Sequence, residues 1–247
     1  MERIINIMDN VSRYISQIKF FGFEKNKKIQ ETSVAVIGLG GLGSWLSEFL
    51  VRIGVKNLAI VDFDIVEEKN LNRQNFIIDD IGKLKIDSIE KRLKEIDNNI
   101  NIEKYKEINK KIFNRDIIFD CTDNIKSKYL INELSVYYNK PYIFASVVMD
   151  QGFVGLINPE QFCLYDIYKG KEDVLTCNIT GVDFSAIIFA VSLMLKLFIN
   201  YVFGNRDGIL YHFNIRDKFY LEEIKVKSNN CKICKRKEFE LIWNYLK

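Results

Sequence analysis

Short continuous runs of apolar residues recur along the first half of the chain. Four of them predict strands buried on both faces, at Val34–Ile37, Leu58–Val61, Ile117–Phe119 and Tyr142–Phe144. Between these runs, apolar residues recur at helical spacing, once at Leu42, Leu46, Phe49 and Ile53 and again at Ile86, Ile89, Leu93 and Ile96. Strands that alternate with helices form right-handed crossovers and a parallel sheet. The pattern predicts a doubly wound, Rossmann-like α/β fold.

The second half of the chain has a different pattern. Extended segments near Phe153–Ile157, Leu210–Ile215 and Phe219–Val226 predict antiparallel strands that continue or edge the sheet. The stretch Tyr165–Gly181 is polar and has no clear period, so we expect a long loop there. No repeat or linker divides the chain. We therefore expect a single domain over residues 1–247, with a nucleotide-binding half at 13–150 and a second half at 151–247.

The segment Phe184–Phe203 has two interpretations. It is long enough to span a bilayer and is apolar on nearly every face, which is also typical of a helix buried in a core or a subunit interface. Lys196 and Asn200 favour the buried helix, because a lysine deep in lipid is costly.

Composition narrows the function classes. Lys and Arg total 36 against 33 for Asp and Glu, so the net charge of +3 is too small for a general attraction to nucleic acid or membrane. Residues Met1–Arg13 lack the continuous apolar stretch of a secretory signal, and we expect a cytoplasmic protein. Five cysteines are present, and Cys231-x-x-Cys234 in a reducing compartment favours a metal over disulfides.

A glycine-rich motif follows the first predicted strand and opens the first predicted helix. Its glycines are Gly38, Gly40, Gly41 and Gly43. Glycines let the backbone approach a phosphate, and the helix N-terminus offers it unpaired N–H groups. Asp62 and Asp64 end the next strand, where a carboxylate hydrogen-bonds ribose hydroxyls. These residues predict a nucleotide-binding site but do not distinguish NAD from other nucleotides. The alternative without a ligand is that the glycines form a tight turn and Asp62 caps a strand.

Polar residues further along favour ATP over NAD. Two amides, a guanidinium and an ammonium lie where they could hold phosphates: Asn70, Gln74, Arg73 and Lys85. Asp123 and Asn124 follow a strand at the sheet edge where such folds bind ligands, and a carboxylate there suits Mg²⁺. Taken singly, Arg73 and Lys85 could be solvated charges, and Asp123-Asn124 could cap a helix.

The order and spacing of these blocks resemble the ThiF/MoeB/HesA family, relatives of the ubiquitin-activating enzymes. The blocks are Arg13-Tyr14, Gly38–Gly43, Val61–Asp64, Asn70–Gln74, Gly82–Lys85, Asp120–Asn124 and the final cysteine pair. The resemblance implies an adenylyltransferase that joins the C-terminal glycine carboxylate of a ubiquitin-like sulfur carrier with a Gly-Gly tail to AMP. It implies that Asp62, Asn70, Arg73, Gln74 and Lys85 bind ATP and that Asp123 binds Mg²⁺.

The same resemblance implies roles outside the nucleotide motifs. It predicts a homodimer in which Arg13 enters the neighbouring subunit's site. It places a structural Zn²⁺ on Cys163, Cys231 and Cys234, with Asp166 standing where the family has a further cysteine. Cys177 corresponds to a loop cysteine that forms a covalent link in some members. We expect Arg13, Arg73, Lys85, Asp123 and Cys177 to be the catalytic set.

Three alternatives stay open from the sequence. The first is another chemistry of the family, ATP-dependent dehydration of a threonylcarbamoyl group on tRNA, which Gly43-Ser44-Trp45 suggests. The second is an NAD-dependent oxidoreductase, and the third is a non-catalytic partner subunit that binds a ubiquitin-like protein. The presence of Arg13, Arg73, Lys85 and Asp123 together favours an active adenylyltransferase.

Overall fold

The computed structural model describes residues 12–170, 181–216 and 219–245, and within them the chain forms one eight-stranded sheet. Its strands lie in the order β3-β2-β1-β4-β5-β6-β7-β8. They are β1 (Ser33–Ile37), β2 (Asn57–Val61), β3 (Asn101–Tyr105), β4 (Ile117–Asp120), β5 (Tyr142–Val148), β6 (Gln151–Ile157), β7 (Ile209–Asn214) and β8 (Tyr220–Glu223). The strands from β3 to β5 pair in parallel, and those from β5 to β8 pair antiparallel. Both halves of the fold prediction are confirmed.

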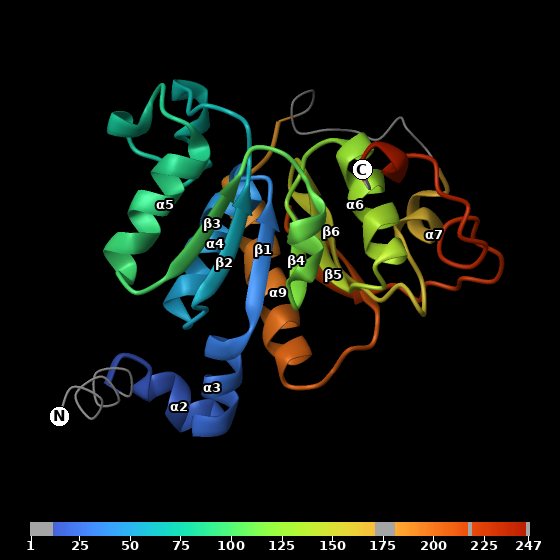
Figure 1. Ribbon diagram of the computed structural model, residues 1–247, viewed down its shortest axis with the longest axis horizontal. Coiled ribbons are helices and arrows are strands. Elements are labelled where there is room, and N and C mark those ends of the chain that lie inside the picture. Colours follow the sequence, from blue (N-terminus) through green and yellow to red (C-terminus); the bar gives the residue numbers. More distant parts are fainter. Residues whose placement is uncertain (1–11, 171–180, 217–218, 246–247) are drawn as a thin grey trace.

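Helices cover both faces of this sheet (Figure 1). The α-helices are α2 (Ile15–Phe21), α3 (Phe23–Glu31), α4 (Gly41–Arg52), α5 (Lys85–Ile96), α6 (Ile125–Tyr137), α7 (Leu164–Tyr168) and α9 (Phe184–Val202). Short 3₁₀ turns are η1 (Glu68–Asn70), η2 (Ile78–Asp80), η3 (Lys110–Asn114) and η4 (Ile242–Asn244). One core lies under α4, α5 and α9, and the other lies under α6, α7 and η4.

Alternation along each central strand divides its side chains between the two cores. In β1, Val34 and Val36 enter the core under α4, whereas Ala35 and Ile37 enter the core under α6. All four are 2% exposed or less. A strand buried on both faces is therefore apolar at every position, which is why a continuous run predicted it.

Two local features differ from the prediction. Strand β3 was not predicted, because its sequence Asn-Ile-Glu-Lys-Tyr is polar and the strand lies at the exposed edge of the sheet. The expected loop Tyr165–Gly181 overlaps a helical turn, α7. The Asp166 carboxylate accepts a hydrogen bond from Cys163 N–H at 2.9 Å and so caps that turn. Residues 171–180 of the same segment lie outside the described residues.

Helix α9 is the apolar segment for which the sequence left two interpretations, a membrane-spanning helix or a buried one. Its length and composition suffice to cross a bilayer, and 44% of its apolar window is buried inside the protein. One side of the helix packs on the sheet and on α4 through Ala186, Ala190, Met194 and Phe198, each fully buried. One such helix is also what the core of a globular domain contains. The structure supports the buried-helix interpretation for that side.

Helices α2 and α3 form an N-terminal arm that extends away from the sheet (Figure 1). Ile29 of α3 is fully buried against the first core, and Phe21 packs edge-on against Phe203 beyond α9. Phe20 and Phe23 of the arm are 80% and 52% exposed. The arm is thus joined to the body by a few contacts and presents apolar surface outside them.

We predict that Gly43→Ala destabilises the protein. A methyl group at position 43 would lie 1.8 Å from Gly38 O and 3.1 Å from Cys121 Cβ, so the loop or α4 must move. Overpacking at such a site costs about 2 kcal/mol or more of the free energy of unfolding. Urea unfolding followed by circular dichroism measures the difference.

Gly40→Ala is the matched control, because a methyl group there meets only Gln74 Nε2, at 4.0 Å. An equal loss of stability in both variants would contradict the packing argument.

Candidate functional site

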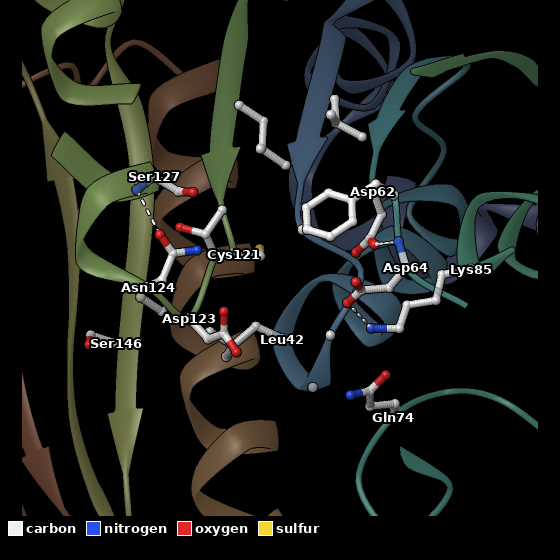
Figure 2. Close-up of a pocket in the computed structure, with 18 of the residues that line it drawn as sticks. Leu42, Asp62, Asp64, Gln74, Lys85, Cys121, Asp123, Asn124, Ser127 and Ser146 are labelled. Carbon is white, nitrogen blue, oxygen red and sulfur yellow. Dashed lines mark hydrogen bonds and ion pairs between the residues drawn. The ribbon is translucent and has the colours of Figure 1, made fainter. Parts of the chain in front are cut away.

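The candidate site is a cavity of about 550 Å³ at the carboxyl ends of the parallel strands. It opens where β1 lies between β2 and β4, so that successive crossovers leave in opposite directions. Ligands bind at this switch point in open α/β sheets. Figure 2 shows Asp62, Asp64 and Lys85 on one side of the cavity and Asp123 and Asn124 facing them from the other.

The glycine-rich loop lines the cavity between these two sides. Gly38, Gly40 and Gly41 belong to the lining, whereas Gly43 does not. Gly38 adopts φ +88°, and a Cβ atom there would lie 2.9 Å from Cys121 O. Both the backbone conformation and the lack of space therefore require glycine at this position. Helix α4 begins at Gly41 and directs its first N–H groups toward the cavity. Gly43 instead permits the close crossing of α4 over Gly38.

Asp62 holds this loop in place. Its Oδ2 accepts a hydrogen bond from Leu39 N–H at 2.6 Å, and its Oδ1 accepts one from Asp64 N–H at 2.8 Å. Burial raises the pKa of Asp62, against the opposing effect of the Leu39 N–H and of Lys85. Both carboxylate oxygens therefore already bind backbone, and the loop that would receive a phosphate depends on them.

Asp64 and Lys85 form an ion pair across the cavity wall. The Lys85 ammonium lies 2.9 Å from Asp64 Oδ2, and its side chain is 7% exposed against 50% for Asp64. Asp64 O also accepts the Lys85 N–H that opens α5, at 2.9 Å. A buried ammonium with one exposed carboxylate partner keeps a positive charge directed at the cavity. Asp64 is the more accessible of the two acids for a ribose.

The residues after η1 divide between the cavity and the scaffold. Arg73 and Gln74 line the cavity, and the buried Gln74 Oε1 has no hydrogen-bond partner among the described residues. The Arg73 guanidinium donates to Lys69 O at 2.8 Å. Asn70, predicted as a ligand, is 4% exposed and outside the cavity lining; its Oδ1 accepts Glu67 N–H at 2.9 Å and closes η1. Asn70 thus supports this turn, and its role as an ATP ligand stays a prediction.

On the opposite side, the end of β4 positions Asp123 and Asn124. Asn124 Oδ1 accepts Ser127 N–H at 2.8 Å, so this residue is the N-cap of α6 as well as part of the lining. Asp123 is exposed and lines the cavity. The buried Asp120 carboxylate accepts Thr122 N–H at 3.0 Å and pairs with the buried Lys128 ammonium at 3.4 Å. These contacts fix the turn that carries Asp123.

Several lining residues were not predicted. Lys106, Glu107 and Ile108 follow the edge strand β3, and Ser146 lies in β5. Tyr245 reaches the cavity from the far end of the chain. No local pattern marks these residues, because they enter the site only through strand order and the path of the C-terminal segment.

The predicted metal ligands come together at a second place, beside α7. One atom from each of Cys163, Asp166, Cys231 and Cys234 lies within 4.8 Å of the others. Cys163 Sγ is 3.6 Å from Cys231 Sγ, and Cys234 Sγ donates to Asp166 Oδ2 at 3.3 Å. A hydrogen bond from the Cys163 thiol lowers the pKa of Cys231, which favours the thiolate form of that residue. Three sulfurs and one carboxylate oxygen fit tetrahedral Zn²⁺.

Arg13 and Cys177 are the two remaining residues of the predicted catalytic set. Arg13 is half-exposed at the start of the N-terminal arm, outside the cavity lining, and pairs with Asp97 at 3.4 Å. Cys177 lies outside the described residues. Cys121 is buried in the cavity wall, and burial raises the pKa of its thiol, which is therefore protonated at neutral pH.

A doubly wound sheet whose glycine loop, acids and cations meet at one cavity is typical of a nucleotide-binding protein. The sequence model of the ThiF family matches residues 11–235, and the chain belongs to this family. It is 34% identical over 175 residues to the adenylyltransferase and sulfurtransferase UBA4 of Meyerozyma guilliermondii, covering 66% of this chain and 41% of that protein. It is 29% identical over 245 residues to the adenylyltransferase and sulfurtransferase MOCS3 of Drosophila virilis, covering 92% and 54%.

The chain thus spans about half the length of these curated relatives. Among solved structures, E. coli MccB with AMPCPP and MccA superposes with a TM-score of 0.76 at 21% identity, covering 91% of this chain and 75% of that one. The structure of E. coli MccB with ATP gives 0.75 at 21% identity, covering 90% and 74%. At this identity the likeness establishes the fold.

We predict that Asp62→Ala loosens the glycine loop. It removes the acceptors of two backbone N–H groups, and leaving such groups unpaired lowers the free energy of unfolding by about 1 to 3 kcal/mol. Thermal unfolding measures the loss. The exposed Asp79→Ala on η2 serves as control, and equal stability of the two variants would argue against this role for Asp62.

Proposed function

We propose that this protein is an ATP-dependent adenylyltransferase that activates the C-terminal glycine carboxylate of a ubiquitin-like sulfur carrier ending in Gly-Gly. One observation carries the proposal: a single cavity joins the glycine loop, Arg73 and Lys85 on one side with Asp123 on the other. Membership of the ThiF family and the adenylyltransferase names of the curated relatives support it. The convergence also disfavours an NAD enzyme, in which these charges would lack a common purpose.

The proposed reaction is a substitution at the α-phosphorus of ATP. A carboxylate oxygen of the carrier forms a bond to this phosphorus while the bond to the pyrophosphate oxygen breaks, giving an acyl adenylate and pyrophosphate. The carboxylate is already ionised at neutral pH, so no general base is needed. The site must instead hold the reactants in line and offset negative charge.

The described residues suit these two tasks. The glycine loop and the start of α4 offer backbone N–H groups to phosphate oxygens, and Arg73 and Lys85 supply positive charge on the same wall. Asp64 is accessible to ribose hydroxyls, and Gln74 Oε1, which has no hydrogen-bond partner among the described residues, can accept a hydrogen bond from the nucleotide. Asp123 is the residue that would hold Mg²⁺, which when bound offsets phosphate charge and orients the leaving group.

We further propose that the cluster of Cys163, Asp166, Cys231 and Cys234 holds a structural Zn²⁺. It joins the segment after β6 to the C-terminal segment, which are distant in sequence. The thiolate character of Cys231 favours metal binding. None of the four cluster residues lines the nucleotide cavity, and Asp166 and Cys231 line a second pocket, so the proposed role of the ion is structural.

A homodimer is part of the same proposal. Arg13 lies on the projecting arm and outside the cavity of its own chain, and exposed Phe20 and Phe23 lie on that arm. In a dimer, Arg13 would exchange its contact with Asp97 for a place in the partner's site.

Arg73→Ala and Asp123→Ala are each expected to reduce ATP–pyrophosphate exchange by at least about a hundredfold, because each removes a group that meets phosphate charge. The assay uses purified protein, Mg²⁺ and a panel of Gly-Gly-ending sulfur carriers. Both residues face the cavity, so the folded state should persist.

Matched controls are Arg52→Ala and Asp79→Ala, which remove exposed charges outside the cavity. Wild-type ATP–pyrophosphate exchange in either Arg73→Ala or Asp123→Ala would contradict the proposed function. ATP consumption that depends on tRNA and on no carrier would favour the dehydratase chemistry instead.

For the metal, we expect about one zinc per chain in the purified protein by elemental analysis. Cys234→Ser should lose most of it and lower the melting temperature, because the ion joins two distant segments. Asp166→Cys should retain zinc and release it to a chelator more slowly, since structural sites favour sulfur.

Cys121→Ser is the control, because Cys121 lies in the nucleotide cavity wall and outside the cluster. The zinc assignment would be refuted if the purified wild-type protein contained no zinc and Cys234→Ser had the same melting temperature as the wild type.

A further inference from the structure

The segment 236–245 follows the part of the chain that the ThiF family model matches, which stops at residue 235. It does not extend away from the domain. It runs beside α6 (Figure 1). Its residue Tyr245 belongs to the lining of the nucleotide cavity. A segment outside the family match thus contributes to the candidate site.

Specific contacts fix the path of this segment. The Glu133 carboxylate of α6, 1% exposed, accepts hydrogen bonds from Glu240 N–H at 2.9 Å and Leu241 N–H at 2.8 Å. Ile242 is fully buried in the core under α6. Tyr245 N–H then donates to Ile242 O at 2.8 Å. A buried carboxylate that binds two backbone donors is a strong anchor, because unpairing it would leave a charge in the core.

Tyr245 lies in the half of the cavity that carries no cation. Among the described lining residues, the cations are Arg73, Lys85 and Lys106, and all three come from the side of β2, β3 and α5. The half formed by α6, β5 and Tyr245 carries Asp123 as its one charged residue among the described lining residues, and otherwise presents apolar and neutral polar groups such as Leu130 and Ser146. Phosphates are drawn to the first half, which leaves the second half for the uncharged part of the other substrate.

We propose that Tyr245 forms a wall of the acyl-substrate half of the cavity and contacts the C-terminal residues of the carrier. The inference rests on the proposed adenylyltransferase function and names a residue of the same site. A flat aromatic ring with a polar tip suits an extended peptide, since it packs on backbone and offers a hydrogen bond at little entropic cost. Tyr245 is 38% exposed, so its ring remains accessible from the cavity.

The test compares Tyr245→Ala with wild-type full-length protein in ATP–pyrophosphate exchange, using the Gly-Gly-ending carrier that gives the highest wild-type rate. We expect KM for the carrier to rise about tenfold, the effect of losing one well-packed aromatic contact. KM for ATP and kcat should change little, because the residue contributes binding and lies away from the phosphate groups. Trp243→Ala is the matched control: it removes a neighbouring aromatic side chain that is 57% exposed and outside the lining.

A second variant tests the anchor. Glu133→Ala releases the segment 236–245 from α6, so it should raise KM for the carrier to the same degree, and the double variant with Tyr245→Ala should be no worse than either alone. This inference would be overturned if Tyr245→Ala kept the wild-type KM for the carrier, or if the variant raised KM for ATP and left KM for the carrier unchanged. Neither outcome would contradict the proposed function. Absence of exchange in the wild-type protein with every carrier would remove the proposed function, and the inference with it.

Discussion

The close crossing of α4 over the end of β1 is the constraint on which the site depends. Gly43 lies so near Gly38 O that no side chain fits, and Gly38 in turn lies against the backbone of Cys121 at the end of β4. Asp62 then binds Leu39 N–H from the neighbouring strand. Three adjacent strands are joined at one loop, and the N–H groups that open α4 take their direction from it. A shift of this loop would displace the cavity wall that it forms with the start of α4 as a whole.

The two sides of the cavity carry different charged residues. The lining cations Arg73, Lys85 and Lys106 lie on the side of β2, β3 and α5, whereas Asp123 is the one charged residue among the described lining residues of the α6 and β5 side. This division follows from the switch point, because residues on the two sides belong to crossovers that leave the sheet in opposite directions. A reaction between an anionic nucleotide and a peptide carboxylate needs such an arrangement, with phosphate charge offset on one side and space for an extended chain on the other.

Much of the site could be predicted because its residues carry local signals. Gly38, Asp62 and Lys85 each lie at the boundary of a strand or helix, and such boundaries can be located from apolar periodicity. The role of Asn70 in closing a 3₁₀ turn could not be predicted in this way, because apolar periodicity does not indicate that its side chain accepts the Glu67 N–H. Lys106 was missed because the polar edge strand β3 carries no buried face to predict it.

By itself, the sequence determined the class of fold, the family and the residues that meet at the sheet edge, because apolar burial and glycine geometry leave local patterns. It also placed Cys163 and Asp166 at metal-ligand spacing. The tertiary structure decided that Asp62 holds the loop while Asp64 stays accessible, and that Tyr245 enters the cavity. Such facts depend on contacts between residues far apart in the chain, and no local periodicity records them.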